Sequence, residues 1–358
     1  MSSIPLLPGI TSRMVATPRL NIHTRFSGPE DGVPVILVHG NASSATYWEE
    51  IMLKLPEGLR GIALDLRGYG DTDDLLIDAT RGLCDWADDL IALADVLGLE
   101  KFHLAGHSLG GALLFTLAGM IPSRILSVAL VNPGSPYGFG GTKDVEGTPC
   151  YEDFAGSGGG VVNPDFPRLI QEGDRSSDNP QASPRVVMNS FYWKPPFIPE
   201  REEALLSGLL SEKIGPDRYP GDFVASANWP NVSPGVWGPI NAASPKYLGD
   251  SVQRFLAAGP KPPILWVRGD SDQIVSDNSL FDLGTLGMLG VVPGWPGAEV
   301  FPPQPMVSQT RAVLDKYAAA GGSYREVVIQ DTGHTPYVEK PEEFMAAFGP
   351  FLKAHSPA

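Results

Sequence analysis

The sequence predicts an α/β fold: a mostly parallel, doubly wound sheet with helices on both faces and an inserted, mainly helical cap. Two observations predict it. Short apolar runs alternate with helix-like segments over the first 135 residues, as in successive βα units. The alternation stops at the Asn-Pro-Gly stretch 132–134 and resumes at Pro263, so we expect an insertion within a single core.

The elements of the first part follow in order from their apolar periodicity. Residues 14–26 alternate loosely, as an edge strand does, and 33–38 form a continuous apolar run typical of a buried strand. An amphipathic pattern predicts a helix over 84–97, and a strand at 101–105 leads into a helix-forming stretch at 113–120. The other elements expected here are a helix at 44–55 and strands at 61–66 and 125–131.

Beyond residue 135 the chain becomes rich in Gly, Pro and aromatic residues and loses strand periodicity. We therefore expect an α/β core at 1–135 and 260–358, with a cap, or lid, at 136–259 that sets substrate choice. A second stretch rich in Gly and Pro, 280–305, has the composition of a long surface loop. The core is expected to resume with strands at 264–267 and 326–330 and helices at 306–320 and 341–353.

Composition and charge exclude several classes of protein. Of the 358 residues, 42% are hydrophobic and 19% charged, as in ordinary globular enzymes. A net charge of −15 without a basic stripe argues against a nucleic-acid partner, and no apolar run approaches a membrane span. Residues 1–13 lack the pattern of a secretory signal, so a cytoplasmic location is expected. Cys84 and Cys150 form no metal-like or redox-like pair and are expected to be reduced thiols.

The segment Gly106-His107-Ser108-Leu109-Gly110 has the pattern of a nucleophile elbow. It follows an apolar run and leads directly into a helix-forming stretch. Glycines two positions either side of the serine leave room for a sharp strand-to-helix turn that exposes the serine oxygen. Ser108 is therefore the candidate nucleophile.

A serine nucleophile needs a histidine base, which a carboxylate orients. Of the histidines that follow Ser108, His355 lies in the last four residues, whereas His334 lies in a loop just after a predicted strand. His334 is therefore the expected base. The strand that resumes the core is followed by Asp270, positioned to shape the turn, and by Asp272, which lies farther into the loop. Both aspartates are candidates for the acid.

The oxyanion of the reaction needs two hydrogen-bond donors. One is expected from the Leu109 N–H at the start of the elbow helix, and the other from the Asn41 N–H, after the first core strand. The Asn41 side chain has two equally plausible roles, facing the substrate or stabilising the turn. Within the insertion, Phe191, Tyr192 and Trp193 are either the cap's own core or a wall of the substrate pocket.

Two further motifs carry less functional weight. His103 and His107 lie on a strand and its turn without a third ligand of matching spacing, so we expect no metal site. In the segment Asp65-Leu66-Arg67-Gly68-Tyr69-Gly70, Arg67 is expected to hold the loop in place rather than contact substrate.

The chain resembles the α/β-hydrolase superfamily, in its capped branch of serine esterases and haloperoxidase-like enzymes. The resemblance covers 33–135 and 260–353 and rests on five motifs. They are Val-His-Gly-Asn at 38–41, the segment Asp65 to Gly70, the elbow, Gly269-x-x-Asp272, and Gly333-His334 followed by Glu339-x-Pro341-x-x-Phe344. It implies that Ser108, Asp272 and His334 form the triad, in the family's chain order. The family spacing also favours Asp272 over Asp270.

Departures from related families narrow the chemistry that the resemblance implies. Haloalkane dehalogenases and epoxide hydrolases have an aspartate where this chain has Ser108, so neither reaction is expected. The expected function is a serine hydrolase that cleaves carboxylic esters or lactones of medium-sized, largely apolar substrates through an acyl-enzyme, without a cofactor. The alternatives are a C–C bond hydrolase or a perhydrolase with the same triad, and a ligand-binding receptor-like relative.

Overall fold

The computed structural model describes residues 4–357, and its centre is an eight-stranded sheet in the order β1-β2-β4-β3-β5-β6-β11-β12. The pairs β1–β2 and β2–β4 are antiparallel, and all the others are parallel. The predicted α/β class is therefore confirmed. The strands are β1 (Thr11–Ala16), β2 (Asn21–Ser27), β3 (Val33–Val38), β4 (Leu59–Leu64), β5 (Phe102–His107), β6 (Ile125–Val131), β11 (Ile264–Gly269) and β12 (Tyr324–Ile329).

Residues 14–26, expected as one edge strand, belong to two strands joined by a tight turn. The Thr17 hydroxyl accepts hydrogen bonds from the backbone N–H groups of Arg19 and Leu20, both at 3.1 Å. These bonds reverse the chain direction, so that Thr11 pairs with Phe26 across an antiparallel hairpin. A loosely alternating pattern does not reveal such a reversal, because both arms of the hairpin alternate in the same way.

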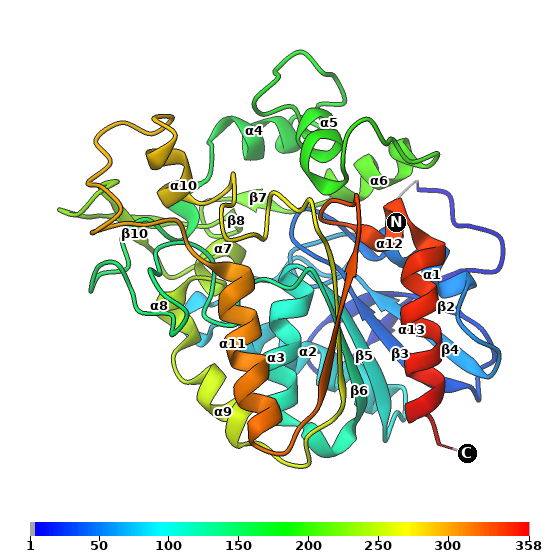
Figure 1. The fold of residues 1–358 in the computed structure, drawn as a ribbon. Coiled ribbons are helices and arrows are strands. Elements are labelled where there is room, and N and C mark those ends of the chain that lie inside the picture. Colours follow the sequence, from blue (N-terminus) through cyan, green and yellow to red (C-terminus); the bar gives the residue numbers. More distant parts are fainter. Residues whose placement is uncertain (1–3, 358) are drawn as a thin grey trace.

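Helices cover both faces of the sheet (Figure 1). Side chains of alternating position in each parallel strand point to opposite faces, and both sets are buried. On β3, for example, Ile36 packs with the helices of one face and Leu37 with those of the other. One face carries α2 (Cys84–Val96), α3 (Leu109–Met120), α9 (Ser251–Ala257) and α11 (Met306–Ala319), and the other α1 (Glu49–Leu53) and α13 (Pro341–His355).

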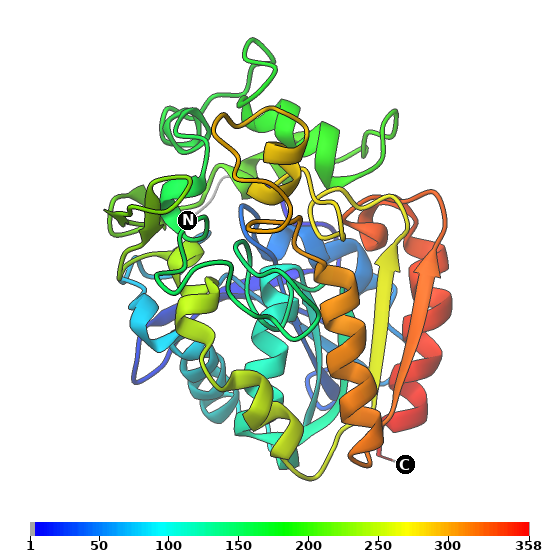
Figure 2. The same cartoon turned by 60° about the vertical axis from the view of Figure 1, so that its left-hand side comes forward.

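The chain between β6 and β11 forms short elements rather than further βα units. Figures 1 and 2 show α4, α5 and α6 above the edge of the sheet where the parallel strands end, with α10 (Leu283–Met288) beside them. The short helices are α4 (Asp165–Gln171), α5 (Pro184–Val187), α6 (Glu202–Leu209), α7 (Pro239–Ala242) and α8 (Pro245–Leu248). Two small sheets pair β7 (Ile214–Gly215) with β8 (Tyr219–Pro220) and β9 (Phe223–Ala225) with β10 (Val232–Pro234).

The remaining elements are single helical turns and one short helix. They are the 3₁₀ turns η1 (Ala45–Trp48), η2 (Ala79–Arg81), η3 (Pro122–Arg124) and η4 (Gly159–Val161), the π-helical turn η5 (Met188–Tyr192), and α12 (Pro336–Glu339). No helix within residues 4–357 is long and apolar enough to span a bilayer.

Helix α9 lies in the range expected for the insertion, yet it packs on core helices. The ring of Phe255 on α9 meets Phe115 of α3 edge-on at 5.2 Å and stacks on Tyr317 of α11 at 4.6 Å. The division of the chain at residue 259 stays a prediction, and this packing favours a boundary before α9.

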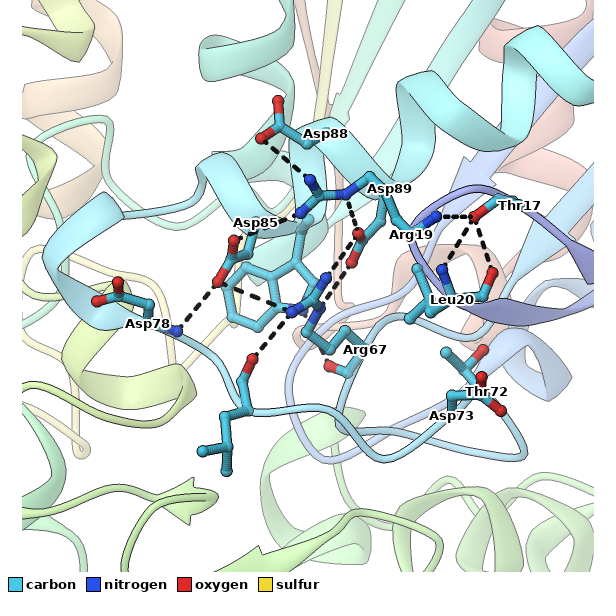
Figure 3. Close-up of polar contacts among 12 residues, drawn as sticks. Thr17, Arg19, Leu20, Arg67, Thr72, Asp73, Asp78, Asp85, Asp88 and Asp89 are labelled. Carbon is cyan, nitrogen blue, oxygen red and sulfur yellow. Dashed lines mark hydrogen bonds and ion pairs between the residues drawn. The ribbon is translucent and has the colours of Figure 1, made fainter.

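A buried ionic cluster holds the loop that follows β4 (Figure 3). Arg67 donates to both carboxylate oxygens of Asp89 on α2, each at 2.8 Å, and to the Leu76 carbonyl oxygen at 3.0 Å. Arg19, from the hairpin, reaches the same Asp89 at 2.6 Å. Three separate segments are thereby tied together, which is the structural role expected of Arg67.

Candidate active site

Ser108 lies at the sharp turn between β5 and α3, with a backbone φ of +54°. A non-glycine residue in this region is strained, and the turn persists because its neighbours approach closely. A Cβ on Gly110 would lie 2.5 Å from the His39 carbonyl oxygen, and one on Gly106 would lie 2.5 Å from the Gly110 carbonyl oxygen. Both flanking glycines are therefore required by space, as the elbow pattern predicts.

His334 and Asp272 meet through a direct hydrogen bond. The His334 Nδ1 lies 2.8 Å from the Asp272 Oδ2, and both side chains are buried. His334 follows β12 and Asp272 follows β11, so the two come from neighbouring parallel strands that end at the same edge of the sheet. Ser108, which follows β5, lines the same cavity as His334.

Asp272 is itself held by three donors. Its Oδ1 accepts from the backbone N–H groups of Ile274 at 2.8 Å and Val275 at 3.0 Å. Its Oδ2, which faces His334, also accepts from the Asn132 side-chain amide at 2.6 Å. These donors fix the position of the carboxylate. Asn132, directly after β6, thus supports Asp272, and no sequence motif indicates this role.

The other acidic and basic candidates lie elsewhere. Asp270 bonds the neighbouring Ser271 hydroxyl at 2.9 Å and receives a long contact of 3.4 Å from the Thr332 N–H. It thus shapes the loop and is not hydrogen-bonded to His334, whose Nδ1 bonds Asp272 instead. His355 ends α13, where its Nδ1 lies 2.8 Å from the Phe351 carbonyl oxygen. The structure therefore pairs His334 with Asp272. Asp270 is not bonded to His334, and His355 is not bonded to Asp272.

His107, next to the nucleophile, supports the base from behind. Its Nε2 lies 2.9 Å from the His334 carbonyl oxygen, and the two rings are 4.6 Å apart. Burial lowers the pKa of His107 well below its ordinary value, so the ring is neutral and the Nε2–H donates to that carbonyl. The sequence motifs single out His107 only as an unconvincing metal ligand, whereas the structure makes it a support for His334. Among residues 4–357 no group of three His, Cys, Asp or Glu side chains is arranged to hold a metal.

The turn after β3 carries the second predicted oxyanion donor. Ala42 has a φ of +46°, and the Asn41 Oδ1 accepts a hydrogen bond from the Tyr69 hydroxyl at 2.8 Å. The Asn41 side chain is thus used to hold the turn, one of the two roles considered for it. Leu109 is the first residue of α3, where backbone N–H groups have no partner within the helix. Asn41 and Leu109 both line the cavity that contains Ser108.

The cavity has a volume of about 400 Å³, and its wall is mostly apolar. Phe191 and Tyr192 belong to the wall, but Trp193 does not; its side chain is 1% exposed and packs in the core. The stretch 280–305, expected as a surface loop, contributes Leu280, Phe281 and further apolar side chains to the wall. Its Gly and Pro content hides them, because no periodicity marks apolar residues in irregular backbone.

No charged side chain lines this cavity. Of the residues in its wall, all from the described part of the chain, none is Asp, Glu, Lys or Arg. The polar groups present are hydroxyl, amide and imidazole groups, among them Ser135, Asn163 and Gln181. Because an isolated charge is costly to transfer into such surroundings, the cavity suits an uncharged guest.

A protein-family model described as the alpha/beta hydrolase fold matches residues 33–286, which is more than half of the chain. The chain belongs to this family. The matched range contains Ser108 and Asp272 and ends before His334.

Individual relatives are distant or match only partly. An uncharacterised carboxylesterase, nap, of Bacillus subtilis is 33% identical over 116 residues, which are 32% of this chain and 38% of the relative. A 2-hydroxy-6-oxo-6-phenylhexa-2,4-dienoate hydrolase of Comamonas testosteroni is 34% identical over 117 residues, 32% of this chain and 40% of the relative. The match thus spans less than half of each relative.

Solved structures of similar fold cover nearly the whole chain. A putative aryl esterase from Burkholderia cenocepacia has a TM-score of 0.60 and 18% identity, over 96% of this chain and 99% of that one. Naproxen esterase from Bacillus subtilis has a TM-score of 0.56 and 18% identity, over 96% of this chain and 91% of that one. At this identity the likeness establishes the fold alone.

Proposed function

We propose that the protein is a serine hydrolase that cleaves uncharged, largely apolar carboxylic esters or lactones of medium size through an acyl-enzyme. The observation that carries the proposal is the 2.8 Å bond between His334 and Asp272 at a cavity that Ser108 also lines. The volume of about 400 Å³ lies within the range of small-molecule sites.

In the proposed mechanism, Ser108 Oγ attacks the carbonyl carbon of the ester while His334 Nε2 takes the hydroxyl proton. Asp272 holds the imidazole by its Nδ1–H and stabilises the imidazolium that forms. The N–H groups of Leu109 and Asn41 donate to the oxyanion. His334 then returns the proton to the leaving alcohol, which departs and leaves Ser108 acylated. A water molecule, deprotonated by His334, releases the carboxylic acid and restores the serine.

The charge of the cavity bears on the first alternative, C–C bond hydrolysis. The Comamonas testosteroni relative acts, by its name, on a dienoate, which is a carboxylate. A buried carboxylate needs a cationic partner or several strong donors, and this wall contains no Lys or Arg. An uncharged ester therefore fits this cavity better than an anionic diketone. Perhydrolysis uses the same triad and the same acyl-enzyme, so the test must compare water with peroxide as the acceptor.

The test is ester turnover by the wild type and by Ser108→Ala. We expect the wild type to hydrolyse p-nitrophenyl esters of medium chain length with an initial burst of nitrophenol, and the variant to lose several orders of magnitude in kcat. Circular dichroism checks that the variant stays folded. Variant activity within about tenfold of wild type would rule out the serine mechanism. Stoichiometric ester binding without turnover by the wild type would instead favour the receptor-like alternative.

A further inference from the structure

Tyr192, the last residue of η5, contacts two separate parts of the proposed machinery. Its hydroxyl group donates at 2.8 Å to the Ala42 carbonyl oxygen, in the turn after β3 that carries Asn41, here called the oxyanion turn. The Tyr192 carbonyl oxygen accepts from the Thr335 N–H at 2.7 Å and from the Thr335 hydroxyl at 2.6 Å. Because Thr335 directly follows His334, a single residue of the chain between β6 and β11 contacts both the oxyanion turn and the loop of the base.

The local structure explains why both groups of Tyr192 are available for these bonds. The last carbonyl groups of a helical turn have no partner within it, and Tyr192 ends η5. The next residue, Trp193, is extended, with φ −133° and ψ 169°. The Tyr192 ring packs against the rings of Tyr47 and Trp193, each at a centroid distance of 6.2 Å. This packing holds the hydroxyl group in place.

The hydrogen bond to Ala42 acts on a strained part of the chain. Ala42 has a φ of +46°, which is unfavourable for a residue with a Cβ. It directly follows Asn41, whose backbone N–H is the proposed second oxyanion donor. Ala42 is 1% exposed, so bulk water does not readily replace a donor that is lost at its carbonyl oxygen. Removal of the Tyr192 hydroxyl would therefore let the turn relax and displace the Asn41 N–H.

The bonds to Thr335 act on the loop that carries His334. A second contact joins the same two segments of the chain. The Glu339 Oε2 accepts from the Gly333 N–H at 2.8 Å and from the Lys194 N–H at 3.2 Å. The stretch that begins at Tyr192 therefore runs against the loop of the base and restricts its movement.

Tyr192 lines the cavity, but its hydroxyl group is already engaged. A tyrosine hydroxyl has one proton, and that of Tyr192 is directed to the Ala42 carbonyl oxygen. While this bond is made, the hydroxyl does not donate to an oxyanion. Any effect of Tyr192 on the reaction must therefore pass through the groups that it holds.

We infer that Tyr192 is a positioning residue, which holds the oxyanion turn by its hydroxyl group and the loop of the base by its carbonyl group. The chain between β6 and β11 then completes the catalytic geometry as well as covering the cavity. This inference rests on the proposed function, because it requires that Ser108 and His334 catalyse ester cleavage.

Tyr192→Phe tests the hydroxyl group, because it keeps the ring and its packing. We expect kcat for a medium-chain p-nitrophenyl ester to fall roughly tenfold, less than the loss of a whole oxyanion donor, with KM within about twofold. Binding of an alkylboronic acid, whose tetrahedral adduct with serine presents an oxygen to the oxyanion donors, should weaken by a similar factor. Unchanged kcat or unchanged affinity for the boronic acid would overturn the inference.

Tyr317→Phe is the matched control. It also removes a buried hydroxyl group that donates to a backbone carbonyl oxygen, that of Pro262 at 2.8 Å. Neither Tyr317 nor Pro262 lines the cavity. The control should lower Tm and keep kcat within about twofold. Equal losses of kcat in Tyr192→Phe and Tyr317→Phe would show a general effect of stability and would also overturn the inference.

The carbonyl end of the link is tested at Thr335. Thr335→Val keeps the shape and the backbone N–H but removes the hydroxyl donor, and it should lower kcat roughly fivefold by loosening the loop of His334. Thr335→Ser keeps the donor and should retain kcat within about twofold. A loss in Thr335→Ser as large as in Thr335→Val would overturn the inference even if Tyr192→Phe misfolds. If wild type and Ser108→Ala turn over the ester equally, the proposed function fails instead.

Discussion

Single side chains distinguish the two aspartates that follow β11. Asp272 bonds His334 and receives three donors, whereas Asp270 bonds the adjacent Ser271 hydroxyl and receives only a long contact from the Thr332 N–H. We predict that Asp272→Asn lowers kcat on the order of a thousandfold or more, because the amide can neither hold the productive tautomer of His334 nor stabilise the imidazolium. Asp270→Asn should keep kcat within about threefold and lower Tm by a few degrees. Steady-state kinetics and thermal melts measure both, and the reverse ranking would move the acid to Asp270.

The sequence predicted these reactive side chains more readily than their supports. Ser108 and His334 each stand in a local pattern with a chemical reason, a glycine-flanked turn and a loop after a strand. Asn132, His107 and Tyr69 act through contacts with residues distant in the chain, such as the 2.6 Å bond from Asn132 to Asp272. A contact between residues 140 positions apart has no local signature, so only the fold reveals it.

At the scale of elements, the buried parallel strands were predictable. Helices cover both faces of the sheet, so these strands are continuous apolar runs in the sequence. The elements above the sheet were less predictable. Phe281 lines the cavity and meets Phe191 edge-on at 5.0 Å, although it lies in a stretch whose composition is that of a surface loop. The Tyr192 hydroxyl donates to the Ala42 carbonyl oxygen at 2.8 Å, so the region expected only to select substrates also contacts the turn after β3 that carries the proposed oxyanion donor Asn41.

The segment 191–193 offers a prediction at this scale, because its aromatic residues differ in placement. Phe191→Ala removes part of the cavity wall and should change the ranking of ester chain lengths about tenfold, which corresponds to 1 to 2 kcal/mol of apolar contact. Trp193→Ala removes a fully packed side chain and should lower the free energy of unfolding by about 3 to 5 kcal/mol without changing the ranking. A panel of ester chain lengths and urea unfolding test both. A changed ranking in Trp193→Ala alone would show that the wall extends to that residue.

The whole molecule has a hydrophobic layer on each face of the central sheet, and several neutral histidines are buried in its interior. Burial lowers the pKa of His39 and His107 and lowers that of His103 to about 4. In the unfolded chain each of these groups binds its proton near pH 6.5. Buried carboxyls act in the opposite direction: burial raises the pKa of Asp282 to about 6, so that the folded state gains a proton first as the pH falls. The net change in the free energy of unfolding with pH is therefore the loss due to the buried histidines minus the gain due to the buried carboxyls.

His103 isolates one of these contributions. Its Nδ1 lies 2.8 Å from the Ser127 hydroxyl and its Nε2 lies 3.1 Å from the Ser356 hydroxyl. Neither His103 nor these serines line the cavity that contains Ser108. Between pH 6.5 and about 4 the unfolded state holds one proton more than the folded state at this site, so the free energy of unfolding falls as the pH falls. Glutamine is polar and uncharged, as neutral histidine is, but it does not bind a proton in this pH range. His103→Gln therefore removes the titration at this site. From pH 7 to pH 5, the free energy of unfolding measured with urea should fall by about 2 kcal/mol less in His103→Gln than in the wild type. Between pH 8 and pH 7 both proteins should change nearly alike, and equal losses down to pH 5 would mean that His103 is protonated in the folded state.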